Sequence, residues 1–93
     1  MLTEYRIFET TVFREDAESL PHAIAPKIAA KLRGYVYPQL RQQPHFGPNI
    51  KKLRQWKPDT WRYRIGPWRF FYEINEDQKI VYMTTLDDRK DAY

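Results

Sequence analysis

The segment from residue 61 to residue 72 combines arginines with aromatic residues in a pattern suited to phosphate binding. Its first half reads W-R-Y-R-I-G, so Arg62 and Arg64 alternate with apolar residues. In a β-strand this alternation places both guanidinium groups on one face and the apolar side chains on the other. After a Gly-Pro break, the second half, W-R-F-F-Y, adds Arg69. A hairpin of the two halves would gather three cations on one small surface, and paired N–H donors make arginine a good ligand for phosphate.

The positive charge of the chain is concentrated in the same part of the sequence. The net charge is +4, but residues 51–72 alone carry seven basic residues and one acid, whereas residues 73–93 carry three basic residues and six acids. Such a basic band favours a polyanionic partner, with nucleic acid as the first candidate. A solvated basic face without a partner is the alternative. Arginines interleaved with aromatic residues favour RNA or DNA, because nucleobases stack on such side chains.

Length and composition predict one cytoplasmic domain that covers residues 1–93. A chain of 93 residues is near the lower limit for a self-sufficient core, and an aromatic content of 16% supplies large side chains to fill it. The chain has no cysteine, which excludes disulfides and thiolate metal sites. No apolar run has the length of a signal peptide or a membrane span, so no membrane association is expected. His22 and His45 lack metal-ligand spacing, and we interpret both as incidental.

Periodicity predicts that the chain begins with a strand and two helices. Residues 4–9 alternate as a strand, and a threonine at position 10 or 11 caps a helix that runs to about residue 20. A longer helix follows, and it is expected to end or kink near Tyr37, or to resume as far as residue 43, because a glycine and a proline lie close by. Its apolar stripe, with residues spaced four apart, consists of Ile24, Ile28, Leu32 and Val36.

Four strands are expected after a loop at residues 44–49. The predicted strands cover residues 50–56, 61–66, 68–75 and 79–86. Tight turns between them make neighbouring strands antiparallel. The element order β-α-α-β-β-β-β therefore predicts an α+β fold with both helices on one face of the sheet. If Phe70 and its neighbours pack under the helices, Arg69 lies on the open face near Arg62 and Arg64.

These motifs together resemble the RelE/ParE superfamily, the small toxins of type II toxin–antitoxin systems, and chiefly its RelE-like branch. The resemblance covers nearly the whole chain, and its segments are specific as a set. They are K-K-L-R at 51–54, W-R-Y-R-I-G at 61–66, W-R-F-F-Y-E-I at 68–74 and D-R-K-D-A-Y at 88–93. The implied fold is an N-terminal strand, a helical hairpin and an antiparallel meander.

In RelE-like toxins this fold is an endoribonuclease that cleaves messenger RNA in the ribosomal A site, and the resemblance implies the same reaction here. The ribose 2′-OH attacks the adjacent phosphate, the 5′-oxygen leaves, and a 2′,3′-cyclic phosphate forms without a metal or other cofactor. The reaction needs a proton acceptor for the 2′-OH, cations for the phosphorane charge and an acid for the leaving oxygen. The implied partners are a cognate antitoxin protein, mRNA and the ribosomal A site.

The resemblance also assigns roles to residues by their position. Arg62 and Arg64 fall where the family has a basic pair on its third strand. Because arginine is a poor base, we assign both to electrostatic contact with phosphate. Arg69 matches the arginine that stabilises the transition state. Tyr93 matches the C-terminal tyrosine, which stacks on a nucleobase or helps to deprotonate the 2′-OH.

The chain departs from the family just before that tyrosine. Many relatives have a histidine five residues upstream of it and others an arginine six upstream, where this chain has Asp88 and Asp87. Asp88 is therefore a candidate general base, and the alternative is a weakened or lost activity. Apart from the resemblance, Asp87 and Asp88 suggest a solvated turn, and Arg69 suggests an ion pair with Glu73 on its own strand.

Five further basic residues are candidates for non-specific contact with the RNA backbone. They are Lys51, Lys52, Arg54, Arg89 and Lys90. Two alternatives to the nuclease stay open at this point. One is a ParE-like toxin that binds and inhibits DNA gyrase, which the arginine set disfavours and the missing histidine favours. The other is a degenerate member that binds RNA without cleaving it.

Overall fold

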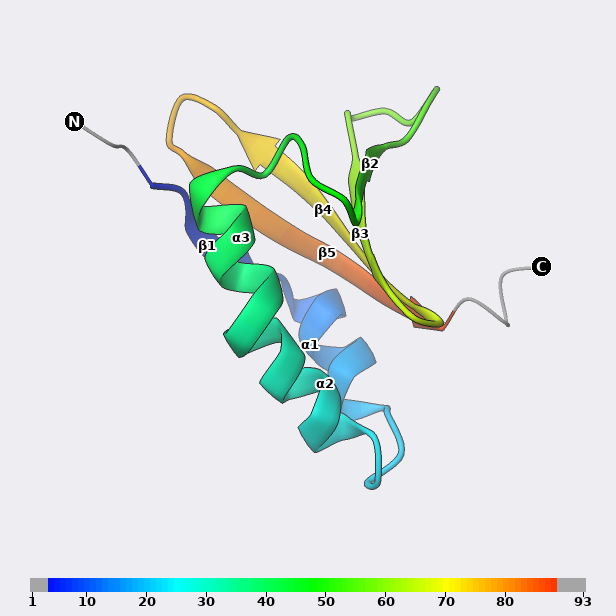
Figure 1. Ribbon diagram of the computed structural model, residues 1–93. Coiled ribbons are helices and arrows are strands. Elements are labelled where there is room, and N and C mark those ends of the chain that lie inside the picture. Colours follow the sequence, from blue (N-terminus) through cyan, green and yellow to red (C-terminus); the bar gives the residue numbers. More distant parts are fainter. Residues whose placement is uncertain (1–3, 89–93) are drawn as a thin grey trace.

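The computed structural model describes residues 4–88 of the chain. A strand, a helical hairpin and four further strands follow one another in the order expected from the sequence (Figure 1). The elements are β1 Arg6–Glu9, α1 Thr11–Glu18, α2 Ala25–Lys31, η1 Leu32–Val36, α3 Tyr37–Gln42, β2 Ile50–Lys52, β3 Trp61–Ile65, β4 Trp68–Asn75 and β5 Ile80–Asp88. Within these residues no helix is long and apolar enough to cross a membrane.

The strands form one mixed sheet in the order β1-β5-β4-β3-β2. The last four are antiparallel neighbours, which confirms the predicted meander. β1 lies at the edge beside β5 and runs parallel to it, with Ile7 opposite Val81. The helical hairpin carries the chain from this edge to the opposite edge, where β2 begins (Figure 1). The sheet is therefore mixed rather than purely antiparallel.

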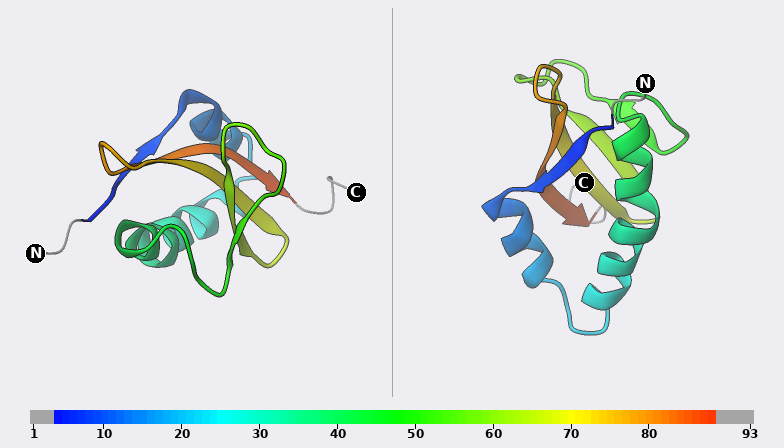
Figure 2. Two further views of the ribbon diagram at one scale, coloured as in Figure 1. Left: turned by 90° about the horizontal axis from the view of Figure 1, so that it is seen from above. Right: turned by 90° about the vertical axis from the view of Figure 1, so that its left-hand side faces the viewer.

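Both helical segments pack on one face of the sheet, as the sequence predicted. They diverge from the loop that joins them, and the sheet closes the wider end (Figure 2). The buried core includes Phe13 from α1, Ile28, Leu32, Val36 and Leu40 from the longer helix, and Tyr63, Phe70, Tyr72, Val81 and Met83 from the sheet. The predicted apolar stripe is confirmed, with Ile24 at its partly buried end and Leu40 extending it by one turn.

Thr10 caps α1, which confirms the helix start expected from the sequence. Its hydroxyl oxygen accepts a hydrogen bond from the Phe13 N–H at 3.2 Å and donates one to the Met83 carbonyl at 2.9 Å. The first bond satisfies one of the N–H groups that a helix start leaves without a partner. The second ties the start of α1 to β5, so this one side chain sets both the first residue and the position of the helix.

The longer helix continues past the position where the sequence predicted an end or a kink. A π-helical turn, η1, joins α2 to α3, and the N–H of Tyr37 donates to the Leu32 carbonyl. Proline lacks an N–H and its ring crowds the carbonyl four residues earlier. The wider π turn lets the helix accommodate Pro38 near the start of α3 and continue to Gln42. The expected interruption is thus a change of helix type, not a break.

Among the strand boundaries that differ from the prediction, the ends of β2 and β5 affect the open face of the sheet. β2 ends at Lys52 instead of residue 56, because the chain turns away at Gln55, whose φ is +65°. β5 runs on to Asp88, where its backbone pairs with Trp68 of β4. Asp87 and Asp88 therefore belong to a strand, and their interpretation as part of a solvated turn was wrong.

Candidate nucleic-acid interface

Side chains from four strands meet on the open face of the sheet, the face that the helices do not cover. Residues paired across neighbouring strands point to the same face of a sheet. The pairing makes two rows, Lys51–Arg62–Phe71–Thr85 and Arg64–Arg69–Asp87. The arginine set expected from the sequence is thus brought together on one surface, near the turn that joins β3 to β4.

Arg69 is held by an ion pair to Asp87 on the neighbouring strand. Its Nη2 lies 2.6 Å from Oδ2 of Asp87, and the two side chains are 11% and 40% exposed. The guanidinium also lies 5.4 Å from the centroid of the Phe71 ring, in the range of a cation–π contact. The predicted ion pair between Arg69 and Glu73 was wrong, because the pairing of β4 with β5 places Asp87 directly opposite Arg69.

Arg64 is oriented by the turn that follows its strand. Its Nε donates to the carbonyl of Gly66 at 3.2 Å. Gly66 has φ +55°, in the left-handed region that glycine enters without strain. A shallow cavity of about 260 Å³ lies beside this turn, lined by Arg62, Arg64, Gly66, Pro48 and Asn49. The two arginines of β3 therefore border a polar hollow next to Arg69.

A larger cavity of about 550 Å³ occupies the centre of the open face. Its walls are cationic and aromatic, and they consist of Lys51, Leu53, Trp56, Arg62, Arg69, Phe71, Thr85 and Asp87. The volume is within the range of small-molecule sites, roughly 300 to 1,000 Å³. Guanidinium groups next to aromatic rings in such a hollow can bind a phosphodiester and its base together.

Among the described residues that line this cavity, Asp87 is the one carboxylate, and it is already bound to Arg69. Within residues 4–88 no group of three or more His, Asp or Glu could hold a metal ion. The described part of the interface therefore offers positive charge suited to binding phosphate.

The other basic candidates that the structure describes lie at three different places. Lys51 lies in the first row and lines the cavity. Lys52 pairs with Trp61 on the other face, where its Nζ lies 5.4 Å from the centroid of that indole and 3.4 Å from the carboxylate of Asp59. Arg54 is exposed beyond the end of β2 and does not line the cavity.

The C-terminal candidates fall at or beyond the limit of the described residues. Asp88 is the last residue of β5, and only its backbone pairing with Trp68 is defined. Arg89, Lys90 and Tyr93 lie outside the described residues. Their assignments stay predictions.

Three residues of the interface were missed by sequence reasoning, namely Trp56, Phe71 and Asp87. The signal for Asp87 was present, because the alternation of Thr85, Leu86 and Asp87 continues the last strand on its open face. Trp56 was placed at the end of the predicted strand 50–56, but β2 ends at Lys52 and the chain turns at Gln55, so strand periodicity did not predict its position.

His45 takes part in a polar cluster at the other end of the sheet, a structural contact that the sequence did not predict. Its Nε2 lies 2.6 Å from Glu76 Oε1, and Oε2 of Glu76 lies 3.0 Å from the Lys79 ammonium. The hydroxyl of Tyr5 donates to the same carboxylate at 3.0 Å. The hydrogen bond from Lys79, followed by that from Tyr5, holds the pKa of Glu76 below its usual range, although partial desolvation opposes the shift.

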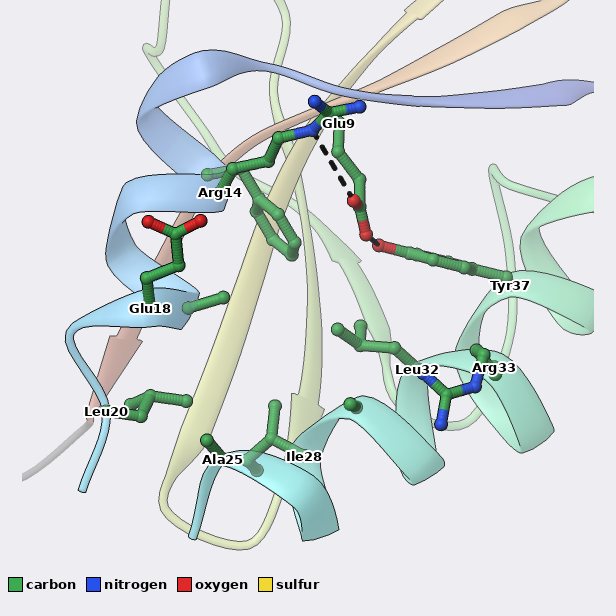
Figure 3. Close-up of a pocket in the computed structure, with 12 residues that line it drawn as sticks. Glu9, Arg14, Glu18, Leu20, Ala25, Ile28, Leu32, Arg33 and Tyr37 are labelled. Atoms are coloured by element: carbon green, nitrogen blue, oxygen red, sulfur yellow. Dashed lines mark hydrogen bonds and ion pairs between the residues drawn. The ribbon is translucent and has the colours of Figure 1, made fainter. Parts of the chain in front are cut away.

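A third cavity, of about 340 Å³, lies between α1 and the longer helix (Figure 3). Its floor is apolar, with Phe13, Ile28 and Leu32, and its rim carries charges of both signs. At one end the Tyr37 hydroxyl donates to Oε2 of Glu9 at 2.5 Å. Burial, followed by this contact with Glu9, raises the pKa of Tyr37, so its phenol stays protonated and keeps donating. We call this cavity the helix groove.

Residues 7–93 match a protein family that is described as ParE toxin of type II toxin-antitoxin system, parDE. The chain therefore belongs to this toxin family, within the RelE/ParE superfamily. A curated relative, Toxin RelG of Mycobacterium tuberculosis, is 30% identical over 90 residues, which cover 96% of this chain and 95% of the relative.

Solved structures support the same assignment. The toxin–antitoxin complex RelBE2 from Mycobacterium tuberculosis contains a chain that is 26% identical, with a TM-score of 0.71, and the match covers 92% of this chain and 99% of that one. A mutant of the E. coli toxin RelE in the free state is 15% identical, with a TM-score of 0.67, over 96% of this chain and 87% of that one. The second likeness supports the fold alone. The expected RelE-like α+β fold is confirmed.

Proposed function

We propose that this toxin is an endoribonuclease that cleaves mRNA bound in the ribosomal A site, by attack of a ribose 2′-OH and without a metal. The observation that supports this proposal is the arginine set of the open face, in which Arg62, Arg64 and Arg69 border adjoining hollows and Asp87 fixes Arg69. A surface of this kind suits a phosphodiester whose charge increases in the transition state.

In the proposed reaction, Arg62 and Arg64 bind the scissile phosphate and its neighbour, and Arg69 stabilises the phosphorane. The 2′-oxygen forms a bond to phosphorus as its proton leaves, and the bond from phosphorus to the 5′-oxygen breaks as that oxygen gains a proton. The products are a 2′,3′-cyclic phosphate and a free 5′-hydroxyl. We assign removal of the 2′-OH proton to Tyr93 or Asp88, since the arginines stay protonated.

We further propose that a cognate antitoxin binds the helix groove. RelBE2 from Mycobacterium tuberculosis is a complex of toxin and antitoxin, which is the precedent for such a partner. An apolar floor between two helices, with charges along its rim, suits the apolar face of an amphipathic helix. The toxin would then act in the cytoplasm, where both the ribosome and the antitoxin are available.

A second candidate function is inhibition of DNA gyrase without RNA cleavage. It is favoured by the description of the matched family as ParE toxins and by the absence of a histidine five residues before Tyr93. In this case the arginine set would have no catalytic role. A degenerate toxin that binds RNA without cleaving it is a weaker form of the first proposal.

Growth inhibition separates the two candidates. We expect Arg69→Ala to abolish growth arrest when the toxin is induced without antitoxin, and Arg6→Ala, which removes an exposed arginine of β1, to leave it intact. Purified wild-type toxin should leave the supercoiling activity of gyrase unchanged. Full growth arrest by Arg69→Ala together with inhibited gyrase would replace the nuclease by the second candidate.

A further inference from the structure

Trp56 is an exposed aromatic residue that stacks on Phe71 beside the arginine set. Its side chain is half exposed, at 50%, and its ring is stacked on Phe71 with 5.7 Å between centroids and 13° between planes. Phe71 itself is buried, so one face of the indole covers the strand. The exposure of Trp56 leaves indole surface accessible next to the large cavity.

The backbone of the loop between β2 and β3 holds Trp56 in this position. Gln55 has φ +65°, a left-handed conformation that costs a non-glycine residue about 1 kcal/mol or more. The loop is closed by a hydrogen bond from the Leu53 N–H to the Thr60 carbonyl at 2.9 Å. Thr60 is buried, and its hydroxyl donates to the Pro58 carbonyl at 2.9 Å. A strained turn on an anchored loop is typical of functional positions.

The indole is also close to the groups assigned to phosphate. Phe71, on which it stacks, is paired with Arg62 across β3 and β4 and contacts the guanidinium of Arg69. Trp56, Arg62 and Arg69 line the same cavity. A nucleotide whose phosphate contacts these arginines would therefore have its base within reach of the indole, and every nucleobase can stack on an aromatic ring.

We propose that Trp56 is a stacking platform for one nucleobase of the bound RNA, next to the scissile phosphate, and thereby a determinant of which codons are cleaved. The proposal rests on the proposed function, because it takes the same RNA as ligand. Purines present the larger stacking surface, so the platform favours a purine at this position over a pyrimidine.

The test is equilibrium binding of the full-length toxin to a short single-stranded RNA, measured by fluorescence anisotropy. The RNA carries 2′-O-methyl groups to prevent cleavage, and a matched series carries one abasic nucleotide at successive positions. Trp56→Leu retains an apolar cover on Phe71 without an aromatic ring, whereas Trp56→Phe retains the ring. Tyr35→Ala removes an exposed aromatic residue of η1 as a control, and Arg69→Ala tests the phosphate contact.

We expect Trp56→Leu to weaken binding about 5- to 100-fold, while Trp56→Phe and Tyr35→Ala stay within about threefold of wild type. An abasic nucleotide at one position should weaken wild-type binding to the same extent and abolish the difference between wild type and Trp56→Leu. An unchanged affinity of Trp56→Leu would overturn the proposal. The proposal would also be overturned if Trp56→Leu bound every abasic RNA more weakly than wild type by the same factor, because the loss of affinity would then come from a change in the fold.

The outcomes also separate this proposal from the function on which it rests. If Arg69→Ala loses binding and Trp56→Leu does not, the platform is refuted and the RNA interface remains. If the wild-type toxin does not bind the free RNA, the stacking platform is refuted, whereas cleavage on the ribosome is tested separately by the growth arrest of wild type and Arg69→Ala. If Trp56→Leu loses affinity for the antitoxin but retains RNA binding, the indole belongs to the antitoxin interface and the proposal fails.

Discussion

At the scale of single residues, the ion pair between Arg69 and Asp87 decides how the interface presents its central cation. The Arg69 side chain is 11% exposed, and its Nη2 lies 2.6 Å from a carboxylate oxygen of the next strand. A guanidinium fixed in this way can meet a developing negative charge without first reorganising. Asp87 is 40% exposed, so solvent screens the pair and its contribution to stability is small. We therefore expect Asp87 to matter more for function than for folding.

The variant Asp87→Asn tests this expectation. It retains an oxygen that can accept from Arg69 but removes the charge, so the guanidinium loses its fixed orientation. We predict a single-turnover cleavage rate on programmed ribosomes about 10- to 100-fold below wild type, with a free energy of unfolding lowered by about 1 kcal/mol or less. Chemical denaturation provides the stability control. A wild-type cleavage rate in this variant would show that Arg69 needs no orienting partner.

At the scale of elements, the helix groove and the open face are surfaces of different chemistry on different sides of the sheet. The groove has an apolar floor formed by α1, α2 and η1, whereas the open face is formed by strands and carries the arginines. An antitoxin helix in the groove would therefore contact none of the three arginines directly. The two functions should separate by mutation.

Ala29 and Ala30 offer a matched pair for this separation. Ala29 lines the groove and is partly buried, whereas Ala30 is exposed and lies outside it. We predict that Ala29→Arg weakens antitoxin binding at least about 10-fold, because a long charged side chain fills the apolar floor. Ala30→Arg should bind as wild type, and both variants should cleave mRNA at the wild-type rate. Isothermal titration calorimetry with the purified antitoxin measures the difference. Equal affinities of the two variants would exclude the groove as the docking site.

The polar cluster around Glu76 joins three separate parts of the chain, and we expect it to make the stability of the fold depend on pH in the acid range. Glu76 lies in the turn between β4 and β5, Tyr5 precedes β1, and His45 belongs to the loop after α3. The pKa of Glu76 is lower in the folded chain than its usual range, mainly through Lys79. The contacts of the carboxylate therefore stabilise the fold above the unfolded-state pKa, and this stabilisation is lost as pH falls through the folded-state pKa.

Glu76→Gln tests this dependence. The amide cannot titrate, so the variant should be less stable than wild type at neutral pH, and the difference should shrink between about pH 5 and pH 3. Urea denaturation at several pH values measures the free energy of unfolding of wild type and variant as a function of pH. A difference that stays constant over this range would show that the charge of Glu76 does not contribute to stability.

At the scale of the whole molecule, local patterns predicted the elements well and the long-range pairing less well. The alternation around Trp61 and Trp68 predicted β3 and β4 almost to the residue, and Thr10 marked the start of α1. The parallel pairing of β1 with β5 joins the two ends of the chain, and no local pattern encodes it. The π turn before Pro38 is likewise a compromise between local chemistry and the packing of a continuous apolar stripe.

The candidate site was predictable where it depends on strand periodicity. The pairing of Arg64 with Arg69 follows from a tight hairpin between two alternating strands. The partner of Arg69 depends on the extent and register of β5, and the position of Trp56 depends on a turn with a positive φ at Gln55. The alternation along β5 indicates the face on which Asp87 lies, but the residues nearby predict neither its pairing with Arg69 nor the position of Trp56.

We propose that the arginine set of the open face cleaves mRNA on the ribosome. This claim can be tested by primer extension on an mRNA translated in vitro, with wild-type toxin, Arg69→Ala and the exposed control Arg6→Ala. We predict new 5′ ends within A-site codons for wild type and Arg6→Ala, and none for Arg69→Ala. Intact mRNA with the wild-type toxin, or the same cleavage by Arg69→Ala, would contradict the claim.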